Sequence, residues 1–163
     1  MRNNQNEICI EFDAVSENEG LARVVIAAFL TNIDPTIEQL EDVKTAVSEA
    51  ITNAIIHGYE EKGGKIVMHA IMKKERILEL NIYDKGVGIE DVDLAMQPMF
   101  TTGADMERSG MGFSFMEAFM DGVEVESSLG NGTVVHMWKN FKLEPDESIA
   151  YFQTIVSNNN GGM

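Results

Sequence analysis

Residues 49–59 read EAITNAIIHGY, a helical stretch that carries a polar stripe beside a long apolar surface. Glu49, Asn53 and His57 recur at intervals of one helical turn, so a helix places them on one face. A glutamate and an asparagine one turn apart are, by themselves, typical of a solvated face or a local hydrogen bond. The interpretation of this stripe therefore depends on which other sequence motifs accompany it.

The composition predicts a single globular domain. The chain has 163 residues, of which 44% are hydrophobic and 24% charged, which is enough to bury a core. Acidic residues outnumber basic ones 27 to 12, and the net charge is −15. This balance argues against a nucleic-acid surface, because duplex binding relies on clustered Lys and Arg. It is compatible with a basic protein partner.

The sequence also predicts a cytoplasmic protein without membrane contact. The N-terminal residues MRNNQNEICIEF lack the apolar core of a signal peptide, and the longest apolar run, VVIAAFL, is too short to span a bilayer. Cys9 is the single cysteine, so no internal disulfide is expected and a reducing compartment is the default.

Hydrophobic periodicity predicts the element order β-α-α-β-β-α-β-β. Because consecutive strands are joined by hairpins, we expect an α+β two-layer sandwich, with a mixed, mostly antiparallel sheet and helices on one face. Residues 1–141 are expected to form this domain and residues 142–163 a C-terminal tail, with a short helix near 148–155 followed by disorder. The expected strands are 7–12, 65–72, 77–84, 123–127 and 133–138, and the expected helices are 17–30, 35–57, 92–96 and 110–121.

Helix boundaries are predicted from end signals. Ser16 followed by Glu19 matches a capping box for the first helix. Asp34 and Pro35 predict the N-cap and first residue of the second helix, and Gly58 its C-cap. The buried side of the second helix is predicted to carry Ile37, Leu40, Val43, Val47, Ile51 and Ile55.

Asp84 is the first candidate binding residue. It continues the core-facing side of its strand, and a carboxylate that points toward the core needs a partner. It either caps the next turn or accepts a hydrogen bond from a ligand amino group such as that of adenine. Gly86 and Gly88 follow at once and allow close backbone approach. Their pattern is not a dinucleotide fingerprint, because Asp91 occupies the third glycine position.

Residues 108–113, RSGMGF, predict an anion site. Gly110 and Gly112 at a helix mouth leave N–H groups exposed, and the guanidinium of Arg108 is able to bind phosphate oxygens. The alternative is a flexible helix start with a solvated arginine. We favour phosphate binding, because the preceding residues 97–109 have no period and are expected to form a lid.

The stripe of Glu49, Asn53 and His57 contains residue types that are able to act beside a bound phosphate. The amide oxygen of Asn53 is a hard ligand that suits Mg²⁺, and Glu49 is able to accept a proton from a nucleophile beside that metal. His57 is interpreted as structural, because it stands where it would contact the last carbonyl groups of the helix.

Together these stretches resemble one family. EAITNAIIHGY resembles the N-box, DKGVGI the first glycine box and GMGFSFM the second glycine box of the Bergerat ATP-binding fold, which gyrase, heat-shock chaperone ATPases, histidine kinases and MutL share as the GHKL superfamily. SEAITNAIIHGY, QPMFTTG and ERSGMGFSFMEAFMD are similar to the anti-sigma factor serine kinases of spore-forming bacteria, closest to the sigma-F type. The resemblance spans about residues 7 to 140 and keeps the motif order of the family.

The resemblance implies a role for each suspected position. Glu49 is the implied general base, and Asn53 is implied to hold Mg²⁺ against the phosphates of ATP or ADP. Asp84, with Thr133 as a helper, is implied to bind the adenine amino group. The remaining implied nucleotide contacts are Gly86 and Gly88 in the adenine pocket, Thr101 and Thr102 in the lid, and Arg108, Gly110, Met111 and Gly112 at the phosphates. The lid departs from the family pattern at Gly103 and Ala104, where the family commonly has lysine and proline.

The function that the resemblance implies is that of an anti-sigma factor with serine kinase activity. Such a protein binds a sigma factor of the sigma-F type and uses Mg-ATP to phosphorylate a serine of its anti-anti-sigma antagonist. A homodimer that associates through the sheet is also implied. A non-catalytic, nucleotide-gated switch is the alternative, and the intact Glu49 argues against it. A self-contained histidine kinase is disfavoured because residues 1–48 contain no histidine, and a mechanochemical ATPase because such chains are much longer.

Overall fold

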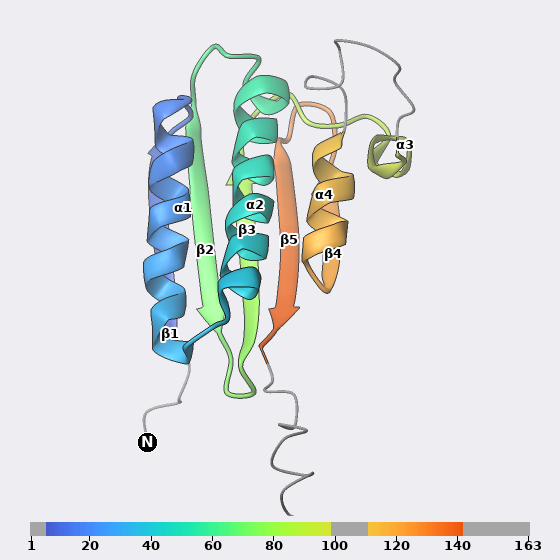
Figure 1. Ribbon diagram of the computed structural model, residues 1–163. Coiled ribbons are helices and arrows are strands. Elements are labelled where there is room, and N and C mark those ends of the chain that lie inside the picture. The colour runs from blue at the N-terminus through green and yellow to red at the C-terminus, as the bar shows by residue number, and fades with distance from the viewer. Residues whose placement is uncertain (1–5, 99–110, 142–163) are drawn as a thin grey trace, which may run out of the picture.

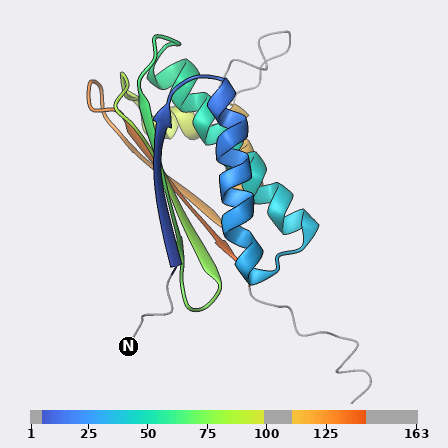
Figure 2. The ribbon, with the colours of Figure 1, turned by 90° about the vertical axis from the view of Figure 1, so that its left-hand side faces the viewer.

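The computed structural model describes residues 6–98 and 111–141, without the side chain of Met111. It has two layers, a five-stranded sheet and a set of helices on one face of that sheet (Figures 1 and 2). The α+β sandwich is thus confirmed, with an antiparallel rather than a mixed sheet in the described part. The strands, in spatial order, are β1 (Asn6–Asp13), β2 (Lys65–Met72), β3 (Ile77–Asp84), β5 (Thr133–Asn140) and β4 (Gly122–Ser127). The helices are α1 (Glu17–Leu30), α2 (Ile37–Asn53), α3 (Val92–Met96) and α4 (Met111–Phe119).

The first helix begins where expected, but the predicted capping box at Ser16 is wrong. The Ser16 side chain makes no capping hydrogen bond. The carboxylate of Glu19 instead accepts a hydrogen bond from Ser48 on α2 and pairs with Arg23 at 3.0 Å. Ser48 on the neighbouring helix and Arg23 one turn further along α1 therefore bind this carboxylate, and it does not cap the N-terminus of its own helix.

The start of α2 is also corrected. Its N-cap is Thr36, which forms a reciprocal capping box with Gln39: the Gln39 N–H donates to Thr36 Oγ1 at 3.1 Å, and the Thr36 N–H donates to Gln39 Oε1 at 3.0 Å. Asp34 lies before the helix in a left-handed conformation, with a φ of 49°. The Asp-Pro pair therefore precedes the helix, and the Thr-x-x-Gln pattern starts it.

The hydrophobic core lies between the inner face of the sheet and the helices. Val43, Val47 and Ile51 of α2 are fully buried against strand residues such as Leu80 and Met137. Burial of a side chain of this size stabilises a fold by about 1.5–3 kcal/mol. Ile37, the first residue of α2, was predicted to be buried but is 81% exposed.

The antiparallel register brings the polar strand ends together. In the β3–β5 pair, Asp84 lies opposite Thr133, so residues far apart in sequence meet at one end of the sheet. The predicted loop at 97–109 is described only as far as residue 98, and the predicted helix at 148–155 lies outside the described residues. Within the described part of the chain, no helix is long and apolar enough to cross a bilayer.

Candidate functional site

The end of α2 widens into a π-helical turn that the sequence pattern did not predict. Residues Ala54–Gly58 form this turn, and the Tyr59 N–H closes it on the carbonyl oxygen of Ala54 at 2.8 Å. Gly58 is therefore not the C-cap that we expected: Ala54 is the C-cap of α2, and Tyr59 is that of the π-helical turn. Gly58 is buried inside the turn, where a Cβ atom would lie 3.0 Å from Asp84 Oδ1. The absent side chain lets the carboxylate approach the helix end, and such wide turns are frequent at functional sites.

A cavity of about 300 Å³ opens beside this turn. The volume lies at the lower end of the range for small-molecule sites. Most of its walls are apolar, and a few polar side chains reach into it, as is typical of a pocket that binds a small organic molecule. The cavity is lined by Ala50, Asn53, Ala54, His57, Gly58, Ile82, Asp84, Gly88, Ile89, Ala95, Phe113, Thr133 and Val135.

Asp84 stands at the end of β3 and faces the cavity, as its strand parity predicted. The backbone N–H groups of Gly86, at 2.9 Å, and of Thr133 donate to its carboxylate. Burial nevertheless raises the pKa of Asp84, because desolvation outweighs the two hydrogen bonds. The Gly86 hydrogen bond confirms that Asp84 stabilises the following turn. The carboxylate also lines the cavity, and its binding of a ligand amino group stays a prediction.

The two glycines after Asp84 are required by packing. A Cβ on Gly86 would lie 2.1 Å from the carbonyl oxygen of Gly58, and the neighbouring Val87 N–H donates to that same oxygen at 2.8 Å. Gly88 has a φ of +76°, and its Cβ would lie 2.0 Å from the carbonyl oxygen of Ser128. The loop is thereby held between the π-helical turn and the β4–β5 turn, which fixes one side of the cavity.

Glu49 and Asn53 meet the N-terminal end of α4, as the combined motifs predicted. A Cβ on Gly112 would lie 2.8 Å from Asn53 Nδ2 and 3.2 Å from Glu49 Oε2. The pKa of Glu49 is raised by burial and, to a lesser degree, by the nearby carboxylate of Glu19. A carboxylate, an amide oxygen and the positive end of a helix dipole therefore lie side by side, an arrangement that is able to bind a phosphate and take up a proton.

The donor set suits one kind of metal site. Among the described residues, no three His, Cys, Asp or Glu side chains cluster as a metal site. A metal held here would take the amide oxygen of Asn53 as a protein ligand, together with waters and phosphate oxygens. Mg²⁺ prefers this pattern, so the residues fit the predicted ion.

Other predicted site residues have different outcomes. Thr101, Thr102, Arg108 and Gly110 lie outside the described residues, and Met111 is the first residue of α4. His57, which we interpreted as structural, has an exposed side chain that lines the cavity. Sequence reasoning also missed the apolar lining, although Ile82 and Val135 share the core-facing parity of Asp84 and Thr133.

Comparison with known proteins identifies the family. Residues 12–139 match the model of the histidine kinase-like ATPase domain. An anti-sigma F factor from Clostridium acetobutylicum is 51% identical over 142 residues, which cover 87% of this chain and 99% of that protein. One from Bacillus cereus is 51% identical over 135 residues, covering 83% of this chain and 92% of the relative. The chain belongs to the anti-sigma F factor family.

Solved structures share the fold of this anti-sigma F family member at low sequence identity. The RsbU and RsbW domains of a Mycobacterium tuberculosis protein align with a TM-score of 0.61 and 16% identity over 85% of this chain and 33% of that one. A blue-light activated histidine kinase domain from Erythrobacter litoralis aligns with a TM-score of 0.51 and 19% identity over 76% of this chain and 61% of that one. At these identities the likeness concerns the Bergerat-type fold alone, and the domain match indicates that the family member binds a nucleotide.

Proposed function

We propose that this family member is an anti-sigma factor with serine kinase activity. It binds a sigma factor of the sigma-F type, and it transfers the γ-phosphoryl group of Mg-ATP to a serine of an anti-anti-sigma antagonist. The relatives named anti-sigma F factor support the first role. The observation that supports the second is the proximity of Asn53 and Glu49 to Gly112, where a Cβ would lie 2.8 Å from Asn53 Nδ2 and 3.2 Å from Glu49 Oε2; we infer that the proposed base and the proposed metal ligand act at this helix mouth.

The proposed transfer uses the residues in distinct roles. The hydroxyl oxygen of the acceptor serine forms a bond to the γ-phosphorus, the bond from that phosphorus to the β-γ bridging oxygen breaks, and ADP leaves. Glu49 takes the hydroxyl proton, and its raised pKa makes it a stronger base than an exposed glutamate. Asn53 would hold Mg²⁺, which neutralises charge on the phosphate oxygens when bound. Asp84 and Thr133 hold the adenine.

Substitution of Glu49 by Gln tests the kinase role. Glu49→Gln keeps the size of the side chain but removes the base, so transfer of labelled phosphate to the antagonist should fall at least about a hundredfold. Binding of ADP, measured by calorimetry, should change little. Glu41→Gln is the matched control, because Glu41 lies on the same helix, is exposed and pairs with Lys44. Undiminished phosphorylation by Glu49→Gln would end the assignment of the base.

The second candidate is a nucleotide-gated switch that holds the sigma factor without turnover. The raised pKa of Glu49 at the helix mouth favours the kinase, since a pure switch has no use for a strong base there. Incubation with labelled ATP and the antagonist separates the two, because a switch leaves no phosphoserine.

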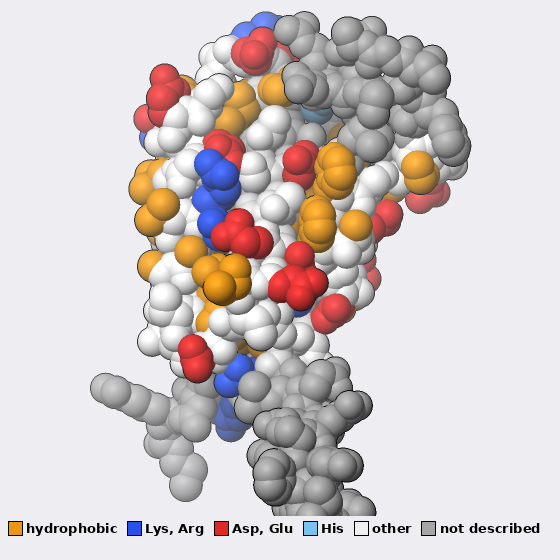
Figure 3. All heavy atoms as spheres, viewed as in Figure 1, with side chains coloured by type: hydrophobic (Ala, Val, Ile, Leu, Met, Phe, Trp, Pro, Cys, Tyr) orange, Lys and Arg blue, Asp and Glu red, His pale blue; other side chains and the backbone are white. Residues whose placement is uncertain are grey.

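The surface is compatible with the proposed partners. The net charge of −15 favours a basic partner surface, and acidic side chains are spread over the helical face in Figure 3. Apolar side chains also reach that face, among them Val24 of α1, which is 66% exposed, and Phe115 of α4, which is 41% exposed. Polar and apolar side chains are mixed in this way on many protein-binding surfaces.

We propose a homodimer through the other face of the sheet, which no described helix covers (Figure 2). Tyr83, Val134 and Trp138 project from its central strands on the side opposite the core. Aromatic side chains such as those of Tyr83 and Trp138 are enriched at protein interfaces. Sedimentation velocity tests the proposal, and a single species of monomer mass at micromolar concentration would reject it.

A further inference from the structure

Ser127, the last residue of β4, makes three polar contacts through one hydroxyl oxygen. The backbone N–H of Ile89 donates to Ser127 Oγ at 2.8 Å. The Ser127 hydroxyl donates to the carbonyl oxygen of Gly132 at 2.7 Å, and Thr133 Oγ1 lies 2.9 Å away. No motif of the sequence drew attention to this residue, and the proposed kinase mechanism does not use it.

The direction of each hydrogen bond follows from the supply of protons. A hydroxyl has one proton to donate and two lone pairs with which to accept. The single proton of Ser127 is committed to Gly132, because a carbonyl oxygen is unable to donate. In the remaining contact Thr133 must therefore be the donor, and Ser127 Oγ the acceptor. The hydroxyl proton of Thr133 then points away from the cavity, and only lone pairs of Thr133 Oγ1 remain for a ligand.

The neighbouring carboxylate of Asp84, like Thr133 Oγ1, offers only hydrogen-bond acceptors to the cavity. Asp84 lies opposite Thr133 in the strand pair, and it already receives N–H groups from Gly86 and from Thr133 itself. Both side chains line the cavity, and Thr133 is only 7% exposed. This end of the cavity thus offers acceptors from two strands. It suits a ligand edge that supplies N–H donors, directly or through a bridging water.

The hydroxyl of Ser127 is well placed to maintain this arrangement, because its surroundings are rigid. Its donor Ile89 follows Gly88, whose φ of +76° and close contact with Ser128 fix the loop. The Gly130 N–H donates to the carbonyl oxygen of Val87 at 2.8 Å, which ties the same loop to the β4–β5 turn a second time. The three partners of Ser127 are therefore held in place independently of a ligand.

We propose that Ser127 is a positioning and specificity-determining residue, which holds Thr133 as an acceptor so that the cavity selects a 6-aminopurine over a 6-ketopurine. The inference rests on the proposed binding of an adenine nucleotide at Asp84 and Thr133. A 6-keto group would place its oxygen against acceptors only, and an unpaired buried acceptor is strongly unfavourable. Without Ser127, the Thr133 hydroxyl is free to rotate and donate to that oxygen.

Affinities for ADP and IDP, measured by calorimetry with Mg²⁺ present, test the proposal. IDP differs from ADP in carrying a keto oxygen in place of the 6-amino group. We expect the wild-type protein to prefer ADP at least about a hundredfold. Ser127→Ala should lower that preference about tenfold, mainly through tighter binding of IDP, and Ser127→Thr, which keeps a hydroxyl, should restore it. The preference is a ratio, so a loss of folded protein does not alter it.

A double-variant cycle separates the proposed role from a merely structural one. Thr133→Val removes the hydroxyl that Ser127 orients, so adding Ser127→Ala to it should leave the ADP-to-IDP preference unchanged. The proposal is overturned if Ser127→Ala leaves the preference at the wild-type value, weakens both nucleotides equally, or lowers the preference just as much beside Thr133→Val. If the wild-type protein binds neither nucleotide, the proposed function fails, and the selection of the base fails with it.

Discussion

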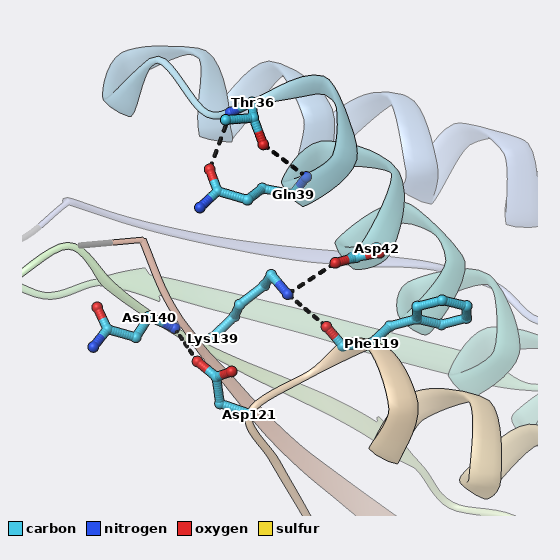
Figure 4. Close-up of polar contacts among 7 residues, drawn as sticks. All are labelled: Thr36, Gln39, Asp42, Phe119, Asp121, Lys139 and Asn140. Carbon is cyan, nitrogen blue, oxygen red and sulfur yellow. Dashed lines mark hydrogen bonds and ion pairs between the residues drawn. The ribbon is translucent and has the colours of Figure 1, made fainter. Parts of the chain in front are cut away.

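The two ends of α2 differ in whether their polar side chains have partners within the fold. At the N-terminal end, Thr36 and Gln39 satisfy each other's backbone N–H groups (Figure 4). One turn later, Asp42 accepts from Lys139 of β5 at 3.0 Å, and the same ammonium donates to the carbonyl oxygen of Phe119, at the end of α4, at 2.6 Å. These four polar groups, the two backbone N–H groups, the Asp42 carboxylate and the Lys139 ammonium, all have partners within the chain.

At the C-terminal end the polar groups face a cavity instead. Among residues 6–98 and 111–141, neither the side chain of Glu49 nor that of Asn53 has a hydrogen-bond partner, and Asp84 keeps acceptor capacity that the fold does not use. Glu49 and Asp84 both have a raised pKa because burial disfavours their charged forms. At the N-terminal end of α2, polar groups are paired within the fold and stabilise it. At the C-terminal end, polar side chains lack such partners and face the cavity in which we propose that a nucleotide binds. Substitutions at the two ends should therefore affect different measurements.

The largest expected effect on stability is at the N-terminal end. Lys139→Met leaves the carboxylate of Asp42 and the carbonyl oxygen of Phe119 without their cation, in a region where the Lys139 side chain is only 11% exposed. Removal of one partner from a buried ion pair is strongly unfavourable, so the free energy of unfolding should fall by about 3 kcal/mol. Urea unfolding followed by circular dichroism measures it.

Two further variants make this prediction specific. Lys44→Met also removes a lysine charge, but from an exposed pair with Glu41, and should change the free energy of unfolding by less than about 1 kcal/mol. Replacement of both partners, Asp42→Leu with Lys139→Met, should recover much of the lost stability, because no charge is then left unpaired. Equal effects of Lys139→Met and Lys44→Met would contradict the contrast between the two ends.

The sequence predicted which residues lie at the cavity end of the sheet better than it predicted the backbone turns that form the cavity. The strands 65–72 and 77–84 have the predicted bounds, and strand parity correctly turned Asp84 toward the core. These features follow from local alternation, which one sequence displays directly. The family resemblance assigned Glu49, Asn53 and Gly112 to one site, and the structure places both side chains close to Gly112, where a Cβ would lie within 3.2 Å of each.

The features that the sequence did not predict depend on contacts between distant segments. The helix period continues through Ala54–Gly58, and the wide turn there is accompanied by the packing of Gly86 on the carbonyl oxygen of Gly58. Glu19 matched a capping pattern, but a partner on α2 attracted it. The hydrogen bonds of Ser127 likewise depend on where two turns meet, which no local pattern encodes.

A smaller effect, and one on a different measurement, is expected from Gly112→Ala at the cavity end. The added Cβ would lie 2.8 Å from Asn53 Nδ2, the far end of a flexible side chain, so the side chain yields and the fold changes little. We expect the free energy of unfolding to change by less than about 1 kcal/mol. The affinity for Mg-ADP, measured by calorimetry, should fall about tenfold, because Asn53 is displaced and a displaced polar partner costs about 1.4 kcal/mol or more.

Gly20→Ala is the control for a glycine in a helix. Its Cβ meets only Arg23 Nη2, at 3.9 Å, within α1. It should raise the free energy of unfolding by about 0.5–1 kcal/mol and leave the affinity for Mg-ADP unchanged. If Gly112→Ala binds Mg-ADP as tightly as Gly20→Ala does, Asn53 does not contribute to the site in the way proposed.

The smallest expected effect concerns pH and Asp84. Its pKa is raised above the ordinary value of 3.8, so the folded protein binds this proton more tightly than the unfolded chain does. The stability that it contributes is present below pH 3.8 and is lost as the pH rises through the higher folded-state pKa. Asp84→Asn should remove this loss and make the ligand-free protein slightly more stable at neutral pH, by less than about 1 kcal/mol, because part of the carboxyl group reaches solvent.

Urea unfolding of Asp84→Asn and wild type between pH 3.5 and 7.5, a range chosen around the ordinary carboxyl pKa of about 4, tests this expectation. Asp93→Asn, on an exposed position of α3, is the control and should keep the pH dependence of the wild type. The same pH dependence in Asp84→Asn and wild type would show that burial of this carboxylate does not oppose folding. If Asp84→Asn gains stability and loses affinity for ADP, the Asp84 charge destabilises the fold and contributes to nucleotide binding. Lys139, at the other end of α2, contributes to stability instead.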